Sequence, residues 1–129
     1  MSSGNVDLVR RGIEDVHAFW AMLDDYVVWD LRDMPAVDIS GVVVGRDAVI
    51  EGSRHYWGTW EDYRLEAEEI IDAGDQVVLV AHHQGRGRKS GVKVDTRFYE
   101  VYTVREGKIS RVDEYDEMAE ALEAAGLSE

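Results

Sequence analysis

The fold is decided by two neighbouring segments near the end of the chain, Thr96–Val104 (TRFYEVYTV) and Lys108–Asp116 (KISRVDEYD). Along both segments the side chains alternate in character, which is the pattern of strands with two different faces. The three residues between them end in Gly107, which suits a type I turn followed by a left-handed residue. The sequence therefore predicts an antiparallel hairpin with a three-residue loop.

That loop also predicts which residues of the hairpin face each other. Val104 would oppose Lys108 and Glu100 would oppose Val112, so that Glu100 and Glu114 become diagonal neighbours, roughly 7–8 Å apart between backbones. Because side chains alternate with period two, one face would carry a mixed apolar and acidic set: Phe98, Glu100, Tyr102, Val104, Val112, Glu114 and Asp116.

Two carboxylates with apolar neighbours form an arrangement in which one carboxyl stays protonated beside an ionised one. The alternative is that this face of the hairpin is exposed and that water solvates both acids.

The composition is that of an ordinary globular protein. The 129 residues, 45% of them hydrophobic, are predicted to form a single domain over residues 1–129 that buries about two thirds of the unfolded surface. The net charge of −13 disfavours nucleic acid and anionic membranes as partners. The absence of cysteine excludes disulfides and thiolate chemistry. Neither a membrane-length apolar run nor a signal segment is evident, so a cytoplasmic location is expected.

Hydrophobic spacing and capping residues predict the order of the elements. Short helices are expected after Asn5 and after Asp15, and the segment Asp33–Ser40 is expected to be irregular. The remaining elements are strands at Tyr26–Leu31, Val42–Val44, Tyr63–Ile71 and Gln76–Gln84, a helix at Asp47–Trp57, a hairpin tip at Gly85–Gly91, and a terminal helix at Glu117–Ala125. This order predicts an α+β fold with helices packed on one face of a curved antiparallel sheet.

Several short motifs then follow one another in a specific order: Asn5–Arg11 (NVDLVRR), Val28–Asp30 (VWD), Gly45–Val49 (GRDAV), Trp60–Tyr63 (WEDY), Asp72–Asp75 (DAGD), Val101–Ile109 (VYTVREGKI) and Glu120–Leu127 (EALEAAGL). In this order, and over nearly its whole length, the chain resembles the SnoaL-like branch of the nuclear transport factor 2-like superfamily. The resemblance implies a cone-shaped, cystatin-like α+β fold with N-terminal helices over a deep apolar pocket, usually in a homodimer. Relatives include ketosteroid isomerase, polyketide cyclases and epoxide hydrolases.

The resemblance also implies roles for three acids. Asp30 falls on the general base of the isomerase-like relatives, and Glu100 falls near the acid that those relatives keep protonated. Glu114 falls where cyclase-like and epoxide hydrolase-like relatives carry an acid. For Asp30, the alternative is a residue at the end of a strand that caps a loop amide.

His82 and His83 are adjacent on a predicted strand, so one side chain should point inward and the other outward. By the resemblance the inward residue is His83 rather than His82, and it would be an acid, a base or a hydrogen-bonded structural residue. The helix tyrosine of the isomerase is missing, since Val6 occupies the nearest position. Tyr102 and Tyr56 are the candidates to stabilise developing negative charge in its place.

Aromatic side chains are predicted to bind a flat apolar ligand, with ordinary core packing as the alternative. The predicted ligand-binding set is Trp20, Trp29, Tyr56, Trp60, Phe98 and Val112, together with Asp116 from the hairpin face. No histidine or carboxylate cluster has the spacing of metal ligands, so neither a metal nor another cofactor is expected.

The sequence thus predicts a SnoaL-like acid–base enzyme of isomerase, cyclase or dehydratase type that acts on a hydrophobic, carbonyl-containing small molecule. Asp30 would move a proton, Glu100 and Glu114 would share one, and His83 and Tyr102 would assist. The alternative is a non-catalytic, dimeric small-molecule-binding module. Tyr99, Val101, Ile109 and Tyr115 would form an apolar second face of the final hairpin, which a second subunit is expected to cover.

Overall fold

The computed structural model describes residues 3–33 and 41–127. Its helices are α1 (Ser3–Glu14), α2 (Val16–Ala21), α3 (Arg46–Gly58) and α4 (Met118–Ala124). Its strands are β1 (Leu23–Asp30), β2 (Val42–Val44), β3 (Trp60–Ala73), β4 (Gln76–Gly87), β5 (Lys93–Arg105) and β6 (Lys108–Tyr115). Apart from Asp33, the segment predicted to be irregular lies outside the described residues. No helix in these two ranges is long and apolar enough to cross a bilayer.

The six strands form one curved, open sheet in the order β2-β1-β6-β5-β4-β3. This confirms the α+β prediction, although one strand pair differs from the expected antiparallel pairing. β1 runs parallel to β6, because the chain crosses over through α3 and the four strands β2–β5 before it returns beside β1. All other neighbouring strands are antiparallel.

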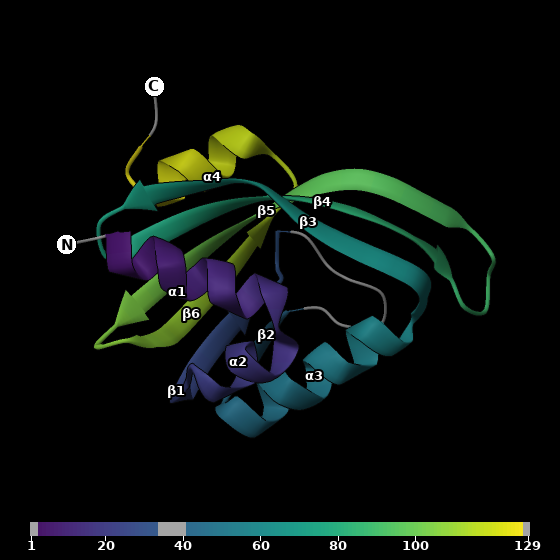
Figure 1. The fold of residues 1–129 in the computed structure, drawn as a ribbon, viewed down its shortest axis with the longest axis horizontal. Helices are drawn as coiled ribbons and strands as arrows, with labels where there is room; N and C mark the ends of the chain where they lie inside the picture. Colours follow the sequence, from purple (N-terminus) through teal and green to yellow (C-terminus); the bar gives the residue numbers. More distant parts are fainter. Residues whose placement is uncertain (1–2, 34–40, 128–129) are drawn as a thin grey trace.

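Irregular pairing bends the sheet around the helices. The β3–β4 register shifts between Glu61 and Arg64 and again between Ala67 and Glu69, and Asp62 has a positive φ of 53° at the first shift. Extra residues of this kind bend a strand and increase its twist. In Figure 1, α1, α2 and α3 lie on one face of the bent sheet and α4 lies on the other.

The main core fills the space between α1–α3 and the inner face of the sheet. Leu8 and Val9 of α1 and Val49 of α3 pack against alternate residues of the strands. The chain turns from α1 into α2 at Asp15, whose side chain accepts a hydrogen bond from the backbone N–H of His17, as predicted for an N-cap. Helix α1 begins at Ser3, so the predicted start at Asn5 falls inside the helix.

A second, smaller core lies under α4 on the outer face. Ala121 of α4 and Ala125, the residue that caps its C-terminus, pack against Val78 of β4 and Val101 of β5. Val101 has no exposed surface in the single chain, and Tyr99 packs at the edge of the same cluster. The terminal helix therefore covers much of the apolar face for which the sequence predicted a second subunit.

The loop of the β5–β6 hairpin differs from the sequence prediction. Arg105 pairs with Lys108, so the loop has two residues, and Glu106 and Gly107 both have positive φ, at 52° and 76°. This is the geometry of a type I′ turn rather than of the predicted three-residue loop. Relative to the prediction, the pairing is displaced by one residue at this point.

A bulge on β6 displaces the pairing once more. Val104 pairs with Ile109 and Thr103 pairs with Arg111, which makes Ser110 the extra residue. Ile109 consequently turns to the inner face, where it is fully buried, so its predicted position on the outer face was wrong.

The two displacements add up to two residues, which preserves the face of every residue beyond the bulge. Glu100 and Glu114 therefore share the inner face as predicted, but they lie directly opposite each other instead of diagonally. Tyr102 likewise lies opposite Val112.

Candidate active site between the helices and the sheet

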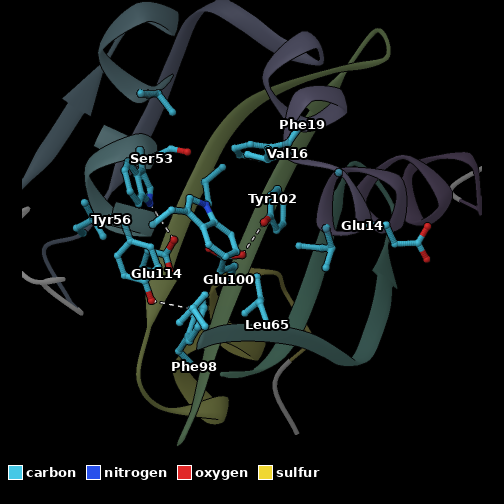
Figure 2. Close-up of a pocket in the computed structure, with 18 residues that line it drawn as sticks. Glu14, Val16, Phe19, Ser53, Tyr56, Leu65, Phe98, Glu100, Tyr102 and Glu114 are labelled. Carbon is cyan, nitrogen blue, oxygen red and sulfur yellow. Dashed lines mark hydrogen bonds between the residues drawn. The ribbon is translucent and has the colours of Figure 1, made fainter. Parts of the chain in front are cut away.

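A cavity of about 320 Å³ lies between the helices and the inner face of the sheet. Figure 2 shows side chains converging on it from α2 and α3 and from strands on both sides of β5, and residues of α1 complete the wall. Its wall is formed by Gly12, Ile13, Glu14, Val16, Phe19, Trp29, Leu31, Val49, Ser53, Tyr56, Trp57, Tyr63, Leu65, Phe98, Glu100, Tyr102, Val112 and Glu114. Glu14 and Trp57 are exposed, so the wall reaches solvent at these two residues.

Two glutamates form the acidic part of this wall. Glu114 is 3% exposed, and its Oε2 accepts a hydrogen bond of 2.8 Å from the indole N–H of Trp29. Its Oε1 is buried without a hydrogen-bond partner among the residues that the structure describes. Directly opposite, Glu100 Oε1 accepts a hydrogen bond of 2.5 Å from the Tyr102 hydroxyl. This contact is drawn as a dashed line in Figure 2.

The surroundings favour a protonated Glu114. Burial raises the pKa of Glu114 well above its ordinary value, and the charge of the neighbouring Glu100 raises it further. The Trp29 hydrogen bond acts in the opposite direction but is a smaller effect. Burial also raises the pKa of Tyr102, so its hydroxyl remains a donor toward Glu100. A protonated Glu114 beside the Glu100 carboxylate therefore fits this arrangement.

Beside the glutamates, two tyrosines and a histidine form a hydrogen-bonded triangle. The hydroxyls of Tyr56 and Tyr63 are 2.8 Å apart and lie 3.2 Å and 3.0 Å from His83 Nδ1. Burial raises the pKa of Tyr56 to about 12, raises that of Tyr63, and lowers that of His83. The triangle is therefore neutral near pH 7, with protonated hydroxyls and an uncharged imidazole.

The structure confirms that His83 points inward. His82 points outward, and its Nε2 lies 2.6 Å from Asp95 Oδ1. The imidazole of His83 reaches the cavity only through the two tyrosine hydroxyls, since His83 is not part of the wall. Sequence reasoning missed Tyr63. The signal that could have found it is the alternation of Tyr63 with Leu65, since both side chains face the cavity from β3.

Asp30 lies on the opposite face of the sheet from the two glutamates, which corrects the expectation of one shared site. It follows Trp29, which faces the cavity, so strand alternation turns Asp30 outward, in register with Asp113. Its carboxylate binds the Arg32 guanidinium at 2.7 Å and that of Arg111 at 2.8 Å.

These contacts explain the ionisation of Asp30. The hydrogen bond from Arg32 is the largest cause that holds the pKa of Asp30 below its ordinary value. Its Oδ1 also accepts the backbone N–H of Arg32 at 3.0 Å, which is the loop-capping role considered as the alternative.

The other predicted ligand-binding residues divide between the cavity wall and its surroundings. Trp20 lies behind the wall, where its indole N–H donates to the hydroxyl of Ser53 at 3.1 Å. Trp60 is buried behind the wall and stacks on Tyr63. Asp116 is exposed beyond the end of β6, so its predicted place in the cavity was wrong. The predicted residues that do line the cavity are Trp29, Tyr56, Phe98, Glu100, Tyr102, Val112 and Glu114.

Metal ligands were not expected from the sequence. Within residues 3–33 and 41–127, no group of three or more histidines or carboxylates is arranged to hold a metal ion.

Comparison with known proteins places this geometry in a family. The profile of the SnoaL-like domain matches residues 6–112. None of the curated proteins matches the sequence. Solved structures with the same fold include an NTF2-like protein of unknown function from Burkholderia pseudomallei, with 22% identity and a TM-score of 0.76 over 93% of this chain and 95% of that one.

Two further solved structures carry names related to enzymes. One is a candidate SnoaL-like polyketide cyclase from Jannaschia sp., with 15% identity and a TM-score of 0.78 over 99% of this chain and 94% of that one. The other, from Catenulispora acidiphila, has a ketosteroid isomerase-like fold and was solved with trimethylamine, with 14% identity and a TM-score of 0.68 over 95% and 92% of the two chains. At these identities the likeness establishes the fold alone.

Proposed function

Because the chain belongs to the SnoaL-like domain family, we propose that it is an acid–base enzyme that acts on a hydrophobic, carbonyl-containing small molecule. The observation that carries the proposal is the pairing of Glu114 with Glu100 at the wall of an apolar cavity. A carboxyl kept protonated beside a charged one supplies an acid and a base within a single site.

The geometry suggests a role for each acid. Glu100, held by the Tyr102 hydroxyl, would take a proton from the carbon next to the ligand carbonyl. Glu114 Oε1 has no hydrogen-bond partner among the described residues, so Glu114 would turn a proton on this oxygen toward the carbonyl oxygen and stabilise the enolate as it forms. Return of the proton to another carbon makes an isomerase, attack of the enolate on a second carbonyl makes a cyclase, and loss of water makes a dehydratase.

The apolar character of the ligand follows from the rest of the wall. Phe19, Leu31, Val49 and Leu65 contribute hydrocarbon surface around the two glutamates. A cavity of about 320 Å³ is at the small end of the range for sites that enclose small molecules. Asp30 takes no part in this scheme, because its carboxylate lies on the outer face between two arginines.

The second candidate function is ligand binding without turnover, and the hydroxyl groups favour it. The Tyr102 hydroxyl is engaged by Glu100, and those of Tyr56 and Tyr63 are engaged with each other and with His83. Only Glu114 would then be free to stabilise an oxyanion. A binding module needs no such stabilisation, since neutral hydrogen bonds and apolar contact suffice for affinity.

We also propose that the protein forms a homodimer through the outer face of β1 and β2. Tyr26, Val42 and Val44 are 84%, 44% and 61% exposed there, outside the region covered by α4. Exposed apolar side chains gathered on one face mark interaction sites. Sedimentation at micromolar concentration should show a dimer that Val44→Glu converts to monomers, and a monomeric parent protein would contradict this proposal.

The test of catalysis uses 2-tetralone, a hydrophobic ketone whose proton next to the carbonyl exchanges with deuterium when a base removes it. NMR in D₂O should show exchange well above that of buffer with the parent protein and a loss of about 100-fold with Glu100→Gln. Glu69→Gln is the matched control, because Glu69 is an exposed glutamate of β3 outside the cavity. Binding without exchange would favour the binding module, and the absence of both would refute the proposal.

A further inference from the structure

The charges on the cavity wall are all of one sign. Among the described residues that line it, the charged side chains are Glu14, Glu100 and Glu114, and neither lysine, arginine nor histidine is present. The rest of the chain reinforces this potential with a net charge of −13. An anionic ligand would therefore meet repulsion on the way in and an unpaired negative charge inside.

The deepest acid of the wall has room for a donor. Glu114 is 3% exposed and its Oε1 has no hydrogen-bond partner among the described residues, although its other oxygen is held by Trp29. Figure 2 shows Glu114 and Glu100 together on the two adjacent strands, facing the same space as Tyr56 and Tyr102. A buried acceptor of this kind requires a donor, which can be its own proton or a group of a ligand.

Aromatic rings line the same cavity. Trp29, Tyr56 and Phe98 line the cavity beside the glutamates, and Phe19 and Tyr102 add two further rings in edge contact with each other. The faces of such rings attract cations, with the strongest effect where water is excluded. Carboxylates and aromatic rings thus favour the same kind of ligand group.

We propose that the cavity binds apolar amines, whose ammonium group lies between the carboxyl groups of Glu100 and Glu114. The exchange conserves charge: the ammonium enters with one positive charge, and one proton leaves the pair for solvent. The ammonium N–H groups donate to Glu114 Oε1 and to Glu100, while the hydrocarbon part of the amine packs on the aromatic rings. The inference uses the cavity of the proposed function but requires no turnover.

The experiment compares three probes with one bicyclic skeleton and different charge: 2-aminotetralin, 2-tetralone and tetralin-2-carboxylate. Affinity is measured by calorimetry and by the fluorescence of Trp29 and Trp57, which both line the cavity. We expect the amine to bind about tenfold tighter than the ketone, and the carboxylate to bind weakest, since charge-assisted hydrogen bonds are roughly twice as strong as neutral ones. Calorimetry in two buffers of different ionisation enthalpy should detect proton release with the amine and none with the ketone.

Two variants locate the effect. Glu114→Gln and the less buried Glu100→Gln should each abolish the preference for amine over ketone, whereas Glu69→Gln should retain it. The inference is wrong if the parent protein binds the amine no tighter than the ketone, or if it binds none of the three probes. Exchange of 2-tetralone without an amine preference would keep the proposed enzyme and refute only this inference, and an amine preference without exchange would do the reverse.

Discussion

The two faces of the sheet hold carboxylates in opposite states, although the residues concerned lie on neighbouring strands. On the inner face, burial raises the pKa of Glu114, which has no cationic neighbour among the described residues of the cavity wall. On the outer face, Arg32 and Arg111 lower the pKa of Asp30, although Asp30 is also buried. Asp113 is intermediate, because burial raises its pKa in spite of the Arg111 guanidinium. The balance between burial and the neighbouring cations therefore decides which acid stays charged.

The largest expected effect is a difference in catalytic activity between a substitution on the inner face and one on the outer face. Glu114→Gln should slow 2-tetralone exchange by about 100-fold, because it removes the acid that faces the cavity. Asp30→Asn should leave the exchange per folded molecule within about twofold, since Asp30 lies outside the cavity wall. NMR exchange rates of folded protein measure both. If Asp30→Asn is the more damaging change, the site includes the outer face and our assignment of the base is wrong.

The second effect concerns the stability of the outer cluster. Arg111→Met removes a guanidinium that binds both Asp30 and Asp113, at 2.8 Å and 2.9 Å. We expect a loss of about 2 kcal/mol in the free energy of unfolding, below the 3–5 kcal/mol of a fully buried pair. The loss is smaller because the Arg111 side chain is 40% exposed and because Arg32 remains beside Asp30.

The matched control for Arg111→Met is Arg10→Met. Arg10 pairs with Asp7 at 3.3 Å on the surface of α1, where the side chains are 51% and 75% exposed. Removal of such a pair should change the free energy of unfolding by less than about 0.5 kcal/mol. Urea denaturation at pH 7 measures both variants. Equal losses would show that the outer cluster behaves like an ordinary surface pair.

The two faces should also respond to pH with opposite signs. The pKa of Glu114 is raised on folding, so the folded state binds more protons and stability falls as pH rises from about 4.5 through the folded pKa. The pKa of Asp30 is lowered, so its stabilisation is present above about 3.8 and is lost as pH falls through the folded pKa.

Each slope can be isolated with a neutral variant. Relative to the parent protein, Glu114→Gln should become progressively more stable as pH rises above about 4.5, and Asp30→Asn should become less destabilising as pH falls below about 3.8. One proton limits either slope to about 1.4 kcal/mol per pH unit. Urea denaturation between pH 3 and pH 9 measures both, and slopes of the same sign would contradict the contrast between the faces.

The sequence was sufficient for the fold, because the elements have strong local signals. Alternation along β5 and β6, the N-cap at Asp15 and the order of the family motifs fix the helices and strands to within a few residues. The parallel pairing of β1 with β6 was missed, since it joins segments far apart in the chain and no local pattern encodes it. The β6 bulge was also missed, because Ser110 carries no local signal for an extra residue.

The site was only partly predictable, because it too depends on strand register and on contacts between residues far apart in the chain. Glu100 and Glu114 were assigned to the correct face although the predicted register was wrong, because two displacements of one residue each add up to two and a shift of two residues preserves the face. Asp30 was assigned by family resemblance, although its alternation with Trp29 could have shown that the two side chains point to opposite faces. The arginines beside Asp30 and the contact of Tyr63 with His83 depend on tertiary packing, which spacing along the chain does not reveal.

The smallest expected effect tests the hydrogen bonds of the inner face. Tyr63→Phe leaves Tyr56 and His83 as a single pair at 3.2 Å, in place of three mutual contacts. The Tyr56 hydroxyl can then donate to His83 Nδ1, so no buried group is left without a partner and the net loss is one hydrogen bond. We expect a decrease of about 1 kcal/mol in the free energy of unfolding.

The hydroxyl of an outer-face tyrosine provides the comparison. Tyr26→Phe removes the same group from a side chain that is 84% exposed, where water replaces any hydrogen bond, so the change should stay below about 0.5 kcal/mol. Urea denaturation of the two variants under one set of conditions gives the difference directly. The two substitutions delete the same atom, so a larger loss at Tyr63 measures what burial adds to that hydroxyl. Equal losses would mean that the triangle only exchanges hydrogen bonds that water could supply, and that His83 has no stabilising role at the cavity.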